Sequence, residues 1–126
     1  MKLSSSKVDC MNIAEVQIFN QDNVNIAIGK TVTMSSGYAG NDMFPGKNLV
    51  NTNTSDFAHT SCGDKGWMKI DLGEPTHISK ITVFNRVDCC QFRLIGTIVE
   101  IINVANVTVF TSPPLTSEMV QDILTV

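Results

Sequence analysis

The chain is poor in charged residues and has no block of either sign. Its 126 residues include 9 Lys and Arg against 12 Asp and Glu, which gives a net charge of −3, and only 17% of the residues are charged. A nucleic-acid-binding domain usually has a basic face, and an anionic membrane surface attracts clustered cations. The composition therefore argues against nucleic acid and against a membrane as partners.

Long apolar runs and signatures of catalysis are also missing. No stretch reaches the roughly 20 apolar residues of a membrane-spanning helix, and residues 1–9 lack the apolar core of a secretory signal. This start is compatible with a mature chain, with a removed signal, or with a piece of a longer protein. Neither His59 nor His77 lies in a hydrolase or metalloprotease motif, so we expect a non-enzymatic protein.

What the sequence does contain is a period-two alternation of apolar and polar residues, which is typical of half-buried β-strands. The pattern predicts six to eight short strands, no amphipathic helix, and an all-β sandwich or barrel that fills residues 1–126 as a single domain, with its core at about 12–110. Residues 35–66 lack strand signals, and such long connections are commonly functional or held by an ion or a disulfide. The predicted strands are residues 13–19, 67–72, 78–84, 97–102, 106–110 and 120–126.

Four cysteines, Cys10, Cys62, Cys89 and Cys90, are enough for two disulfides in any of three pairings. The Cα atoms of neighbouring residues are about 3.8 Å apart, which is closer than the lower limit of about 4.4 Å for ordinary disulfides. A bond between Cys89 and Cys90 would therefore close a distorted ring and form a stiff, apolar plate. Two reduced thiols, or separate bonds to Cys10 and Cys62, stay open as alternatives.

The only two arginines of the chain, Arg86 and Arg93, flank this cysteine pair. Arginine offers a rigid planar fork of donors, which lysine does not. Two such forks at one end of a sandwich suit vicinal hydroxyls, a carboxylate or a phosphate. The simpler alternative is a surface ion pair between Arg86 and Asp88, which contributes little to stability.

A zinc site is a competing interpretation of the same region. His59 and Cys62 have a spacing found in metal sites, and Cys89 and Cys90 lie downstream. Structural zinc ligands, however, are usually separated by two or more residues, and adjacent cysteines fit tetrahedral geometry poorly. We therefore prefer a metal-free role for these cysteines.

Together these residues form a pattern: His59, then Arg86-Val87-Asp88, then Cys89-Cys90, then Arg93. This pattern resembles the signature of the F-type lectins (fucolectins). Three further segments resemble strands of the wider discoidin, or coagulation factor 5/8 type C, superfamily. They are Asn-x-Ala-x-Gly-Lys at 25–30, Trp-x-x-x-Asp-Leu-Gly at 67–73 and Ile-x-x-Ile-x-x-x-Asn-Arg at 78–86.

The resemblance implies an all-β, galactose-binding-like β-sandwich jelly roll with a sugar site at one end, for L-fucose or a related sugar. By position, His59 would bond an axial hydroxyl, and Arg86 and Arg93 would donate to the ring oxygen and its neighbouring hydroxyls. Cys89 and Cys90 would lie against the sugar ring, and Asp88 belongs to the same motif. Neutral sugars offer paired hydroxyls and one apolar face, which these groups match.

The resemblance also implies a structural calcium ion under the long loop. The family motif is similar to Asn-x-Val-Asp-Gly-Asn, and residues 48–53 here read Asn-Leu-Val-Asn-Thr-Asn. Fewer carboxylates weaken calcium binding, although carbonyl oxygens also serve as ligands. The expected ligands are Asn48, Asn51, Asn53 and Glu15. Residues 10–19 resemble the strand that normally closes such domains, so this first strand is expected beside the last one.

Three roles follow from the resemblance. The first is a fucose-type lectin domain for glycan recognition or adhesion. The second is a discoidin-like protein–protein or virion structural module with an unused sugar site, since similar domains occur, by resemblance, in proteins of large DNA viruses and algae. The third is a lipid-binding domain with Tyr38, Met43 and Phe44 as apolar tips, near which Lys47 is the only cation. We expect a glycan as the partner, at the cell exterior or the virion surface; a homo-oligomer or a larger assembly stays open.

Overall fold

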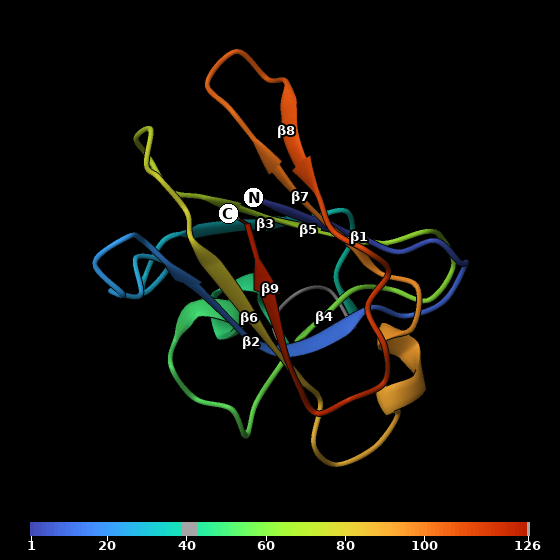
Figure 1. The fold of residues 1–126 in the computed structure, drawn as a ribbon. Coiled ribbons are helices and arrows are strands. Elements are labelled where there is room, and N and C mark those ends of the chain that lie inside the picture. The colour runs from blue at the N-terminus through green and yellow to red at the C-terminus, as the bar shows by residue number, and fades with distance from the viewer. Residues whose placement is uncertain (39–42, 126) are drawn as a thin grey trace.

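In a computed structural model, which describes residues 1–38 and 43–125, the chain folds into two antiparallel β-sheets packed against each other (Figure 1). The five-stranded sheet has the order β3-β5-β1-β7-β8, and the four-stranded sheet has the order β4-β2-β6-β9. The predicted all-β sandwich is confirmed. The strands of the first sheet are β1 (Lys2–Ser4), β3 (Thr31–Met34), β5 (Trp67–Asp71), β7 (Ile98–Ile102) and β8 (Thr108–Thr111), and those of the second are β2 (Asn12–Phe19), β4 (Ala58–His59), β6 (Lys80–Asn85) and β9 (Val120–Leu124).

The structure has nine strands within the described ranges, against six to eight expected, because three short ones give no clear alternation. β1 and β4 have three and two residues. Residues 25–30, expected as a strand by resemblance, contain only an isolated bridge at Asn25, and β3 begins at Thr31. The long connection 35–66 contains β4 and the short 3-10 helix η2 (Gly46–Val50).

The expected place of the first long strand is wrong. β2 does not lie beside β9, because β6 lies between them and pairs with both. Burial gives the reason: β2 is buried along most of its length, while β9 alternates between buried and exposed residues. A strand that is buried on both faces belongs inside a sheet, and a strand with one exposed face tolerates the edge.

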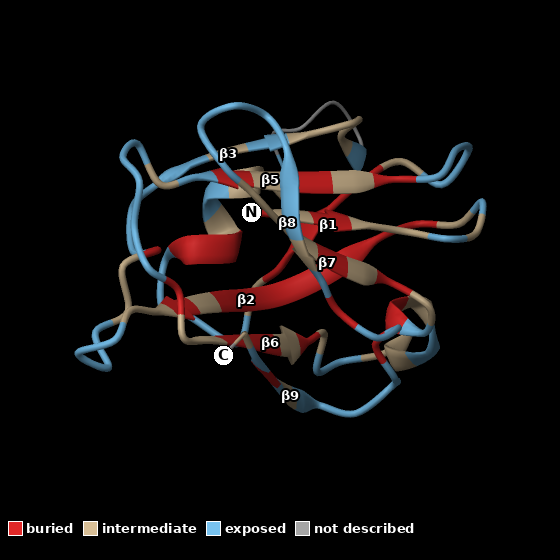
Figure 2. Cartoon of the chain, turned by 45° about the horizontal axis from the view of Figure 1, so that its top comes forward, coloured by how far each residue is buried: buried red, intermediate tan, exposed pale blue. Residues whose placement is uncertain are grey.

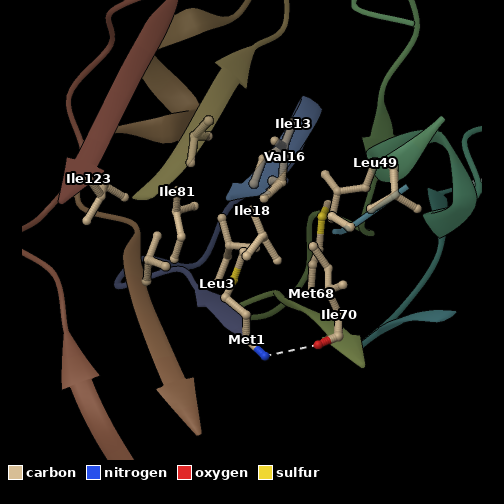
Figure 3. Packing of buried hydrophobic residues seen from close by; sticks show 14 of the residues in the cluster. Met1, Leu3, Ile13, Val16, Ile18, Leu49, Met68, Ile70, Ile81 and Ile123 are labelled. Carbon is tan, nitrogen blue, oxygen red and sulfur yellow. Dashed lines mark hydrogen bonds between the residues drawn. The ribbon is translucent and has the colours of Figure 1, made fainter. Parts of the chain in front are cut away.

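The hydrophobic core lies between the two sheets and also includes residues from both ends of the chain (Figure 3). It extends from Met1 to Ile123, beyond the limits of 12–110 expected from sequence. Met1 and Leu3 bring β1 between β5 and β7, where the Met1 nitrogen donates to the Ile70 carbonyl at 2.9 Å. Figure 2 shows burial concentrated in the central strands and exposure in the β7–β8 hairpin and the loops.

The ends of the sandwich carry different connections. At one end, β6 runs into the loop 86–90 and the short 3-10 helix η3 (Gln91–Leu94), which leads to β7. The β7–β8 hairpin projects from the other end (Figure 1). A disulfide between Cys10 and Cys62 links the segment before β2 to the loop after β4. The segment that bears both arginines is therefore gathered at one end of the molecule.

Candidate functional site

Side-chain amides brace the loop that follows β6. The buried Asn85 donates from Nδ2 to the Gln91 carbonyl at 3.0 Å and accepts from the Arg86 amide at 2.8 Å. Gln91 donates from Nε2 to the Arg86 carbonyl at 3.0 Å. Hydrogen bonds therefore hold residues 86–91 together as one unit, and this unit carries Arg86, Asp88 and the neighbouring cysteines.

Cys89 and Cys90 are disulfide-bonded to each other, and Cys10 is bonded to Cys62. The Cys90 backbone has a φ of 68°, in the left-handed region that L residues rarely adopt. The neighbouring pair is thus the stiff plate considered from the sequence, placed directly before η3. All four cysteines are disulfide-bonded, which argues against the zinc interpretation, because cysteine binds metal as a thiolate.

Arg86 is fixed on two sides. Its Nε donates to Asp88 Oδ1 at 2.6 Å and its Nη2 donates to Asp88 Oδ2 at 3.3 Å. The guanidinium carbon lies 4.1 Å from the centroid of the Phe57 ring, a cation–π contact. The hydrogen bond and the charge of Arg86 lower the pKa of the exposed Asp88 carboxyl. The surface pair considered from sequence is therefore present, and it orients Arg86 while the second Nη atom stays unpaired within the described residues.

Arg93 is less completely paired than Arg86. It lies in η3, with its guanidinium carbon 5.9 Å from the centroid of the Phe92 ring. Its Nε is buried and has no hydrogen-bond partner among the described residues, and Asp9 Oδ1 is 3.9 Å away. A buried donor without a partner costs free energy. The side chain as a whole is 23% exposed, so part of it is open to a ligand.

His59 lies in β4 and is only 4% exposed. Its Nδ1 lies 2.6 Å from the Thr60 carbonyl oxygen, so Nδ1 carries the proton and a neutral ring leaves Nε2 as an acceptor. Burial lowers the pKa of His59, the charges of Arg86 and Arg93 lower it further, and the Thr60 carbonyl opposes both effects. The imidazole is therefore neutral at pH 7.

The structure brings the predicted sugar-contact residues to one place. Phe57 joins them, because its ring lies under Arg86 and 5.9 Å from the His59 ring centroid. Both guanidinium charges act on the pKa of His59. The result is two oriented cationic forks and one neutral acceptor next to a disulfide plate, which can bind a polyhydroxylated ligand.

Sequence reasoning missed most of the contacts that support this arrangement, and it assigned Tyr38 and Phe44 to lipid-binding tips. Tyr38 and Phe44 cover the imidazole, with ring centroids 4.6 and 5.8 Å from that of His59. Asp9 reaches Arg93 from the segment before β2, and Lys7 donates from Nζ to the Phe92 carbonyl at 3.0 Å. Of these supporting residues, only Phe57 could have been found from its position, because it lies two residues before His59 and alternate residues of an extended segment lie on the same face. The others depend on packing between distant segments.

Tyr38, Met43 and Phe44 do not form a set of protruding apolar tips. Phe44 stacks on Phe57 at 4.5 Å between centroids, and Tyr38 lies over His59. Met43 is 61% and Tyr38 43% exposed, while Phe44 is half-buried, and residues 39–42 lie outside the described ranges. Within those ranges, no helix is long and apolar enough to cross a membrane.

A second polar cluster lies beneath the loop that contains η2. Glu15, at a bulge in β2, is completely buried, and neither of its carboxylate oxygens makes a well-formed hydrogen bond among the described residues, although the Thr52 backbone amide lies nearby. Burial raises the pKa of Glu15 to about 7; the Thr52 backbone amide offsets part of this shift and the Asp56 charge adds to it. Thr52, at the glycine position of the family motif, has a φ of 66°.

The expected calcium ligands partly converge on this cluster. Asn51 and Asn53 donate to Asp56 Oδ2 at 2.9 and 3.4 Å, while Asp56 Oδ1 is buried without a partner in the described structure. Asn48 instead donates to the Phe57 carbonyl at 3.1 Å. Asp56 was missed from sequence, although it lies only three residues beyond the motif. No three His, Cys, Asp or Glu side chains in the described ranges gather as a metal site, so amide or carbonyl oxygens would have to complete one.

Comparison with known proteins agrees with this architecture. The model of the NedA-like, galactose-binding domain of F5/F8 type C matches residues 48–122. Fucolectin-3 of Anguilla japonica is 31% identical over 105 residues, which are 76% of this chain and 55% of that protein. Fucolectin-1 of the same organism is 34% identical over 83 residues, 60% of this chain and 46% of that protein. The chain thus spans about half the length of the curated relatives it matches, and no solved structure matches it.

Fold and site together define a β-sandwich domain with a braced, arginine-bearing loop at one end. The chain belongs to the family of F5/F8 type C, NedA-like galactose-binding domains. The resemblance to the discoidin superfamily and to fucolectins, predicted from the motifs, is confirmed.

Proposed function

We propose that this domain binds a glycan that ends in L-fucose or in a sugar with the same arrangement of hydroxyls. The observation that carries the proposal is the pair of guanidinium groups, Arg86 and Arg93, which flank the Cys89–Cys90 disulfide in the sequence and both lie close enough to His59 to lower its pKa. The family's galactose-binding description and the fucolectin names of its relatives support the same ligand class.

Each group has a distinct role in this proposal. Arg93 donates from its unpaired fork to ring and hydroxyl oxygens, and Arg86 donates from the edge that Asp88 leaves free. Neutral His59 accepts a hydroxyl proton at Nε2. The disulfide plate contacts the C–H face of the sugar. Asp88 is a positioning residue, because it holds Arg86 in plane.

Binding, and not catalysis, is the proposed activity. The acidic groups near the arginines have partners that occupy them: Asp88 pairs with Arg86 and Asp9 accepts from the Cys10 amide at 2.7 Å. The two disulfides favour an oxidising setting, such as the cell exterior or a virion surface, since disulfides persist in oxidising compartments.

A structural calcium ion is part of the proposal. The residues present fit a hard cation, because Glu15 and Asp56 have buried carboxylate oxygens without partners in the described chain, and calcium prefers oxygen ligands. Glu15, Asp56, Asn51 and Asn53 would hold the ion, with backbone carbonyls of the same loop. The ion would neutralise the two carboxylates and anchor the loop that positions His59.

One observation favours a second role, a protein–protein or virion structural module. Two donors of Arg86 are engaged by Asp88 within the domain itself, as expected if the sugar site were unused. Under that role the domain would be found bound to a protein partner, and no sugar would compete with the contact.

A glycan array probed with the purified, oxidised domain in calcium tests the proposal. The expected result is binding confined to glycans with terminal fucose or a sugar of the same hydroxyl pattern, with loss of signal in Arg93→Ala. Lys30→Ala is the matched control, because Lys30 is exposed and adjoins β3 at the opposite end of the sandwich. An array with no bound glycan, obtained with a folded domain, would overturn the proposal.

A further inference from the structure

Phe92 is the most exposed aromatic side chain in the described part of the domain. It is 56% exposed, against 43% for Tyr38, although the chain has only eight aromatic residues. It lies in η3 directly before Arg93 and two residues after the cysteine pair. The proposed sugar site uses the residues on both sides of Phe92 but not Phe92 itself.

The backbone of Phe92 is held from several directions. Its carbonyl accepts from Lys7 Nζ at 3.0 Å and from the Ile95 amide at 3.1 Å. The next residue, Arg93, donates its amide to the Cys90 carbonyl at 3.0 Å. The ring therefore projects from a fixed support, and little conformational entropy remains to be lost when a ligand covers it.

Two cations lie near the ring. Lys7 Nζ and the Arg93 guanidinium carbon are both 5.9 Å from its centroid, within the range of cation–π contacts. Lys7 is half-buried and uses one of its three donors on the Phe92 carbonyl. An apolar platform with adjacent donors has the same chemistry as the neighbouring site: a flat surface for C–H groups and donors for hydroxyls.

A single exposed apolar side chain needs no explanation. Phe92 is not isolated, because Val87 and Ile95 are also about half exposed in the same ten-residue segment. The segment also contains both arginines and the disulfide. A stiff, partly apolar surface thus continues from the proposed sugar site toward Lys7, and its donors suit a polyhydroxylated occupant better than an aliphatic one.

We propose that Phe92 and Lys7 form a second sugar subsite, which binds the residue linked to the terminal sugar of the glycan. The C–H face of that second pyranose stacks on the Phe92 ring, and the Lys7 ammonium donates to its hydroxyls. This inference rests on the proposed glycan binding at Arg86 and Arg93. With this subsite, the domain recognises at least two linked sugars.

Calorimetric titration with two kinds of probe tests this subsite. The monosaccharide probe is methyl α-L-fucoside, and the extended probes are α-L-fucosyl disaccharides with 1→2, 1→3, 1→4 and 1→6 linkages. At least one disaccharide should bind about tenfold more tightly than the monosaccharide, since about 1.4 kcal/mol corresponds to that factor. Phe92→Ala should remove this gain, so that the variant binds its best disaccharide no more tightly than it binds the monosaccharide.

The controls separate the subsite from the primary site. Phe92→Trp should keep the gain, Lys7→Met should reduce it, and Leu124→Ala, an exposed apolar change on β9, should leave it intact. Equal affinity of the wild type for the monosaccharide and for all four disaccharides would overturn the subsite, and so would a Phe92→Ala variant that keeps the gain. Failure of every probe, the monosaccharide included, would instead overturn the proposed function on which the subsite rests.

Discussion

The two polar clusters of this domain differ in how their charges are balanced. Around the cysteine pair, Arg86 is matched by Asp88 and by the face of Phe57, and both arginines retain contact with water. Beneath the long loop, Glu15 is fully buried with no partner in the described chain. The first cluster leaves one buried donor, Arg93 Nε, without a partner but no uncompensated carboxylate, and its exposed groups can exchange water for a neutral ligand. The second requires a proton or a cation, because a buried, unpaired carboxylate is costly.

The largest expected effect lies at Glu15, in calcium-free protein. The ordinary pKa of this carboxyl is 4.5 and the folded value is about 7, so between these pH values the folded state binds more protons than the unfolded state. The free energy of unfolding should therefore fall as the pH rises from 4.5 to 7, by up to about 3 kcal/mol. Glu15→Gln removes the charge and should be more stable than the wild type at pH 8 by a similar amount.

Urea denaturation at pH 5 and pH 8 with a chelator measures this difference. Glu118→Gln, a change at an exposed glutamate, should keep the pH dependence of the wild type. If the Glu15→Gln variant were less stable than the wild type at pH 8, the ionised carboxylate would have to be stabilised by an interaction that the described residues do not provide.

Bound calcium should turn the destabilising effect of the ionised Glu15 carboxylate into a stabilising one. In the wild type at pH 8, calcium at a hundredfold excess over its Kd should raise the free energy of unfolding by about 2.7 kcal/mol, and the melting temperature with it. Glu15→Gln and Asp56→Asn should each lose most of this gain. Calorimetric scans with calcium and with magnesium provide the measurement, and equal gains in all three proteins would contradict the proposed ligands.

Substitutions in the arginine cluster should change the affinity for the sugar and not the stability of the fold. Arg93→Lys keeps the charge but replaces the planar fork with a single ammonium group, so the affinity for the sugar should fall about 30-fold, equivalent to about 2 kcal/mol for hydrogen bonds from a charged group. The melting temperature should stay close to that of the wild type. Titration calorimetry and thermal scans of the same samples test both halves, and a variant with lower stability but unchanged affinity would reverse the comparison.

The smallest effect is expected at Asp88. This carboxylate is 62% exposed and only orients Arg86, and exposed ion pairs contribute little. Asp88→Asn should weaken sugar binding less than Arg93→Lys does and should leave the melting temperature unchanged. If Asp88→Asn weakened binding more than Arg93→Lys, Asp88 would be a direct ligand contact and not a positioning residue.

Much of the fold was predictable from sequence because period-two alternation marks half-buried strands directly. β2, β5 and β6 lie within one or two residues of their predicted bounds. β1 was not predictable, because three residues carry no alternation, and its place between β5 and β7 depends on packing of Met1 and Leu3 against distant strands. The order of β2, β6 and β9 likewise depends on which strand is buried on both faces.

The site was predictable where its residues share a short segment and not where they meet by folding. Arg86, the cysteine pair and Arg93 lie within eight residues, so their proximity follows from the sequence. The contact of Lys7 with Phe92, across 85 positions, follows only from the fold. Asp56 was missed because the family motif ends before it, although its carboxylate is the one that Asn51 and Asn53 contact.

The most direct test of the central claim is calorimetric titration of the oxidised wild-type domain with L-fucose, with D-galactose as the comparison sugar. We predict saturable binding of one L-fucose per domain, weaker binding of D-galactose, and loss of the L-fucose signal in Arg93→Ala at unchanged melting temperature. Absence of binding by a folded, calcium-loaded domain with both disulfides intact would contradict the account of the arginine cluster as a sugar site.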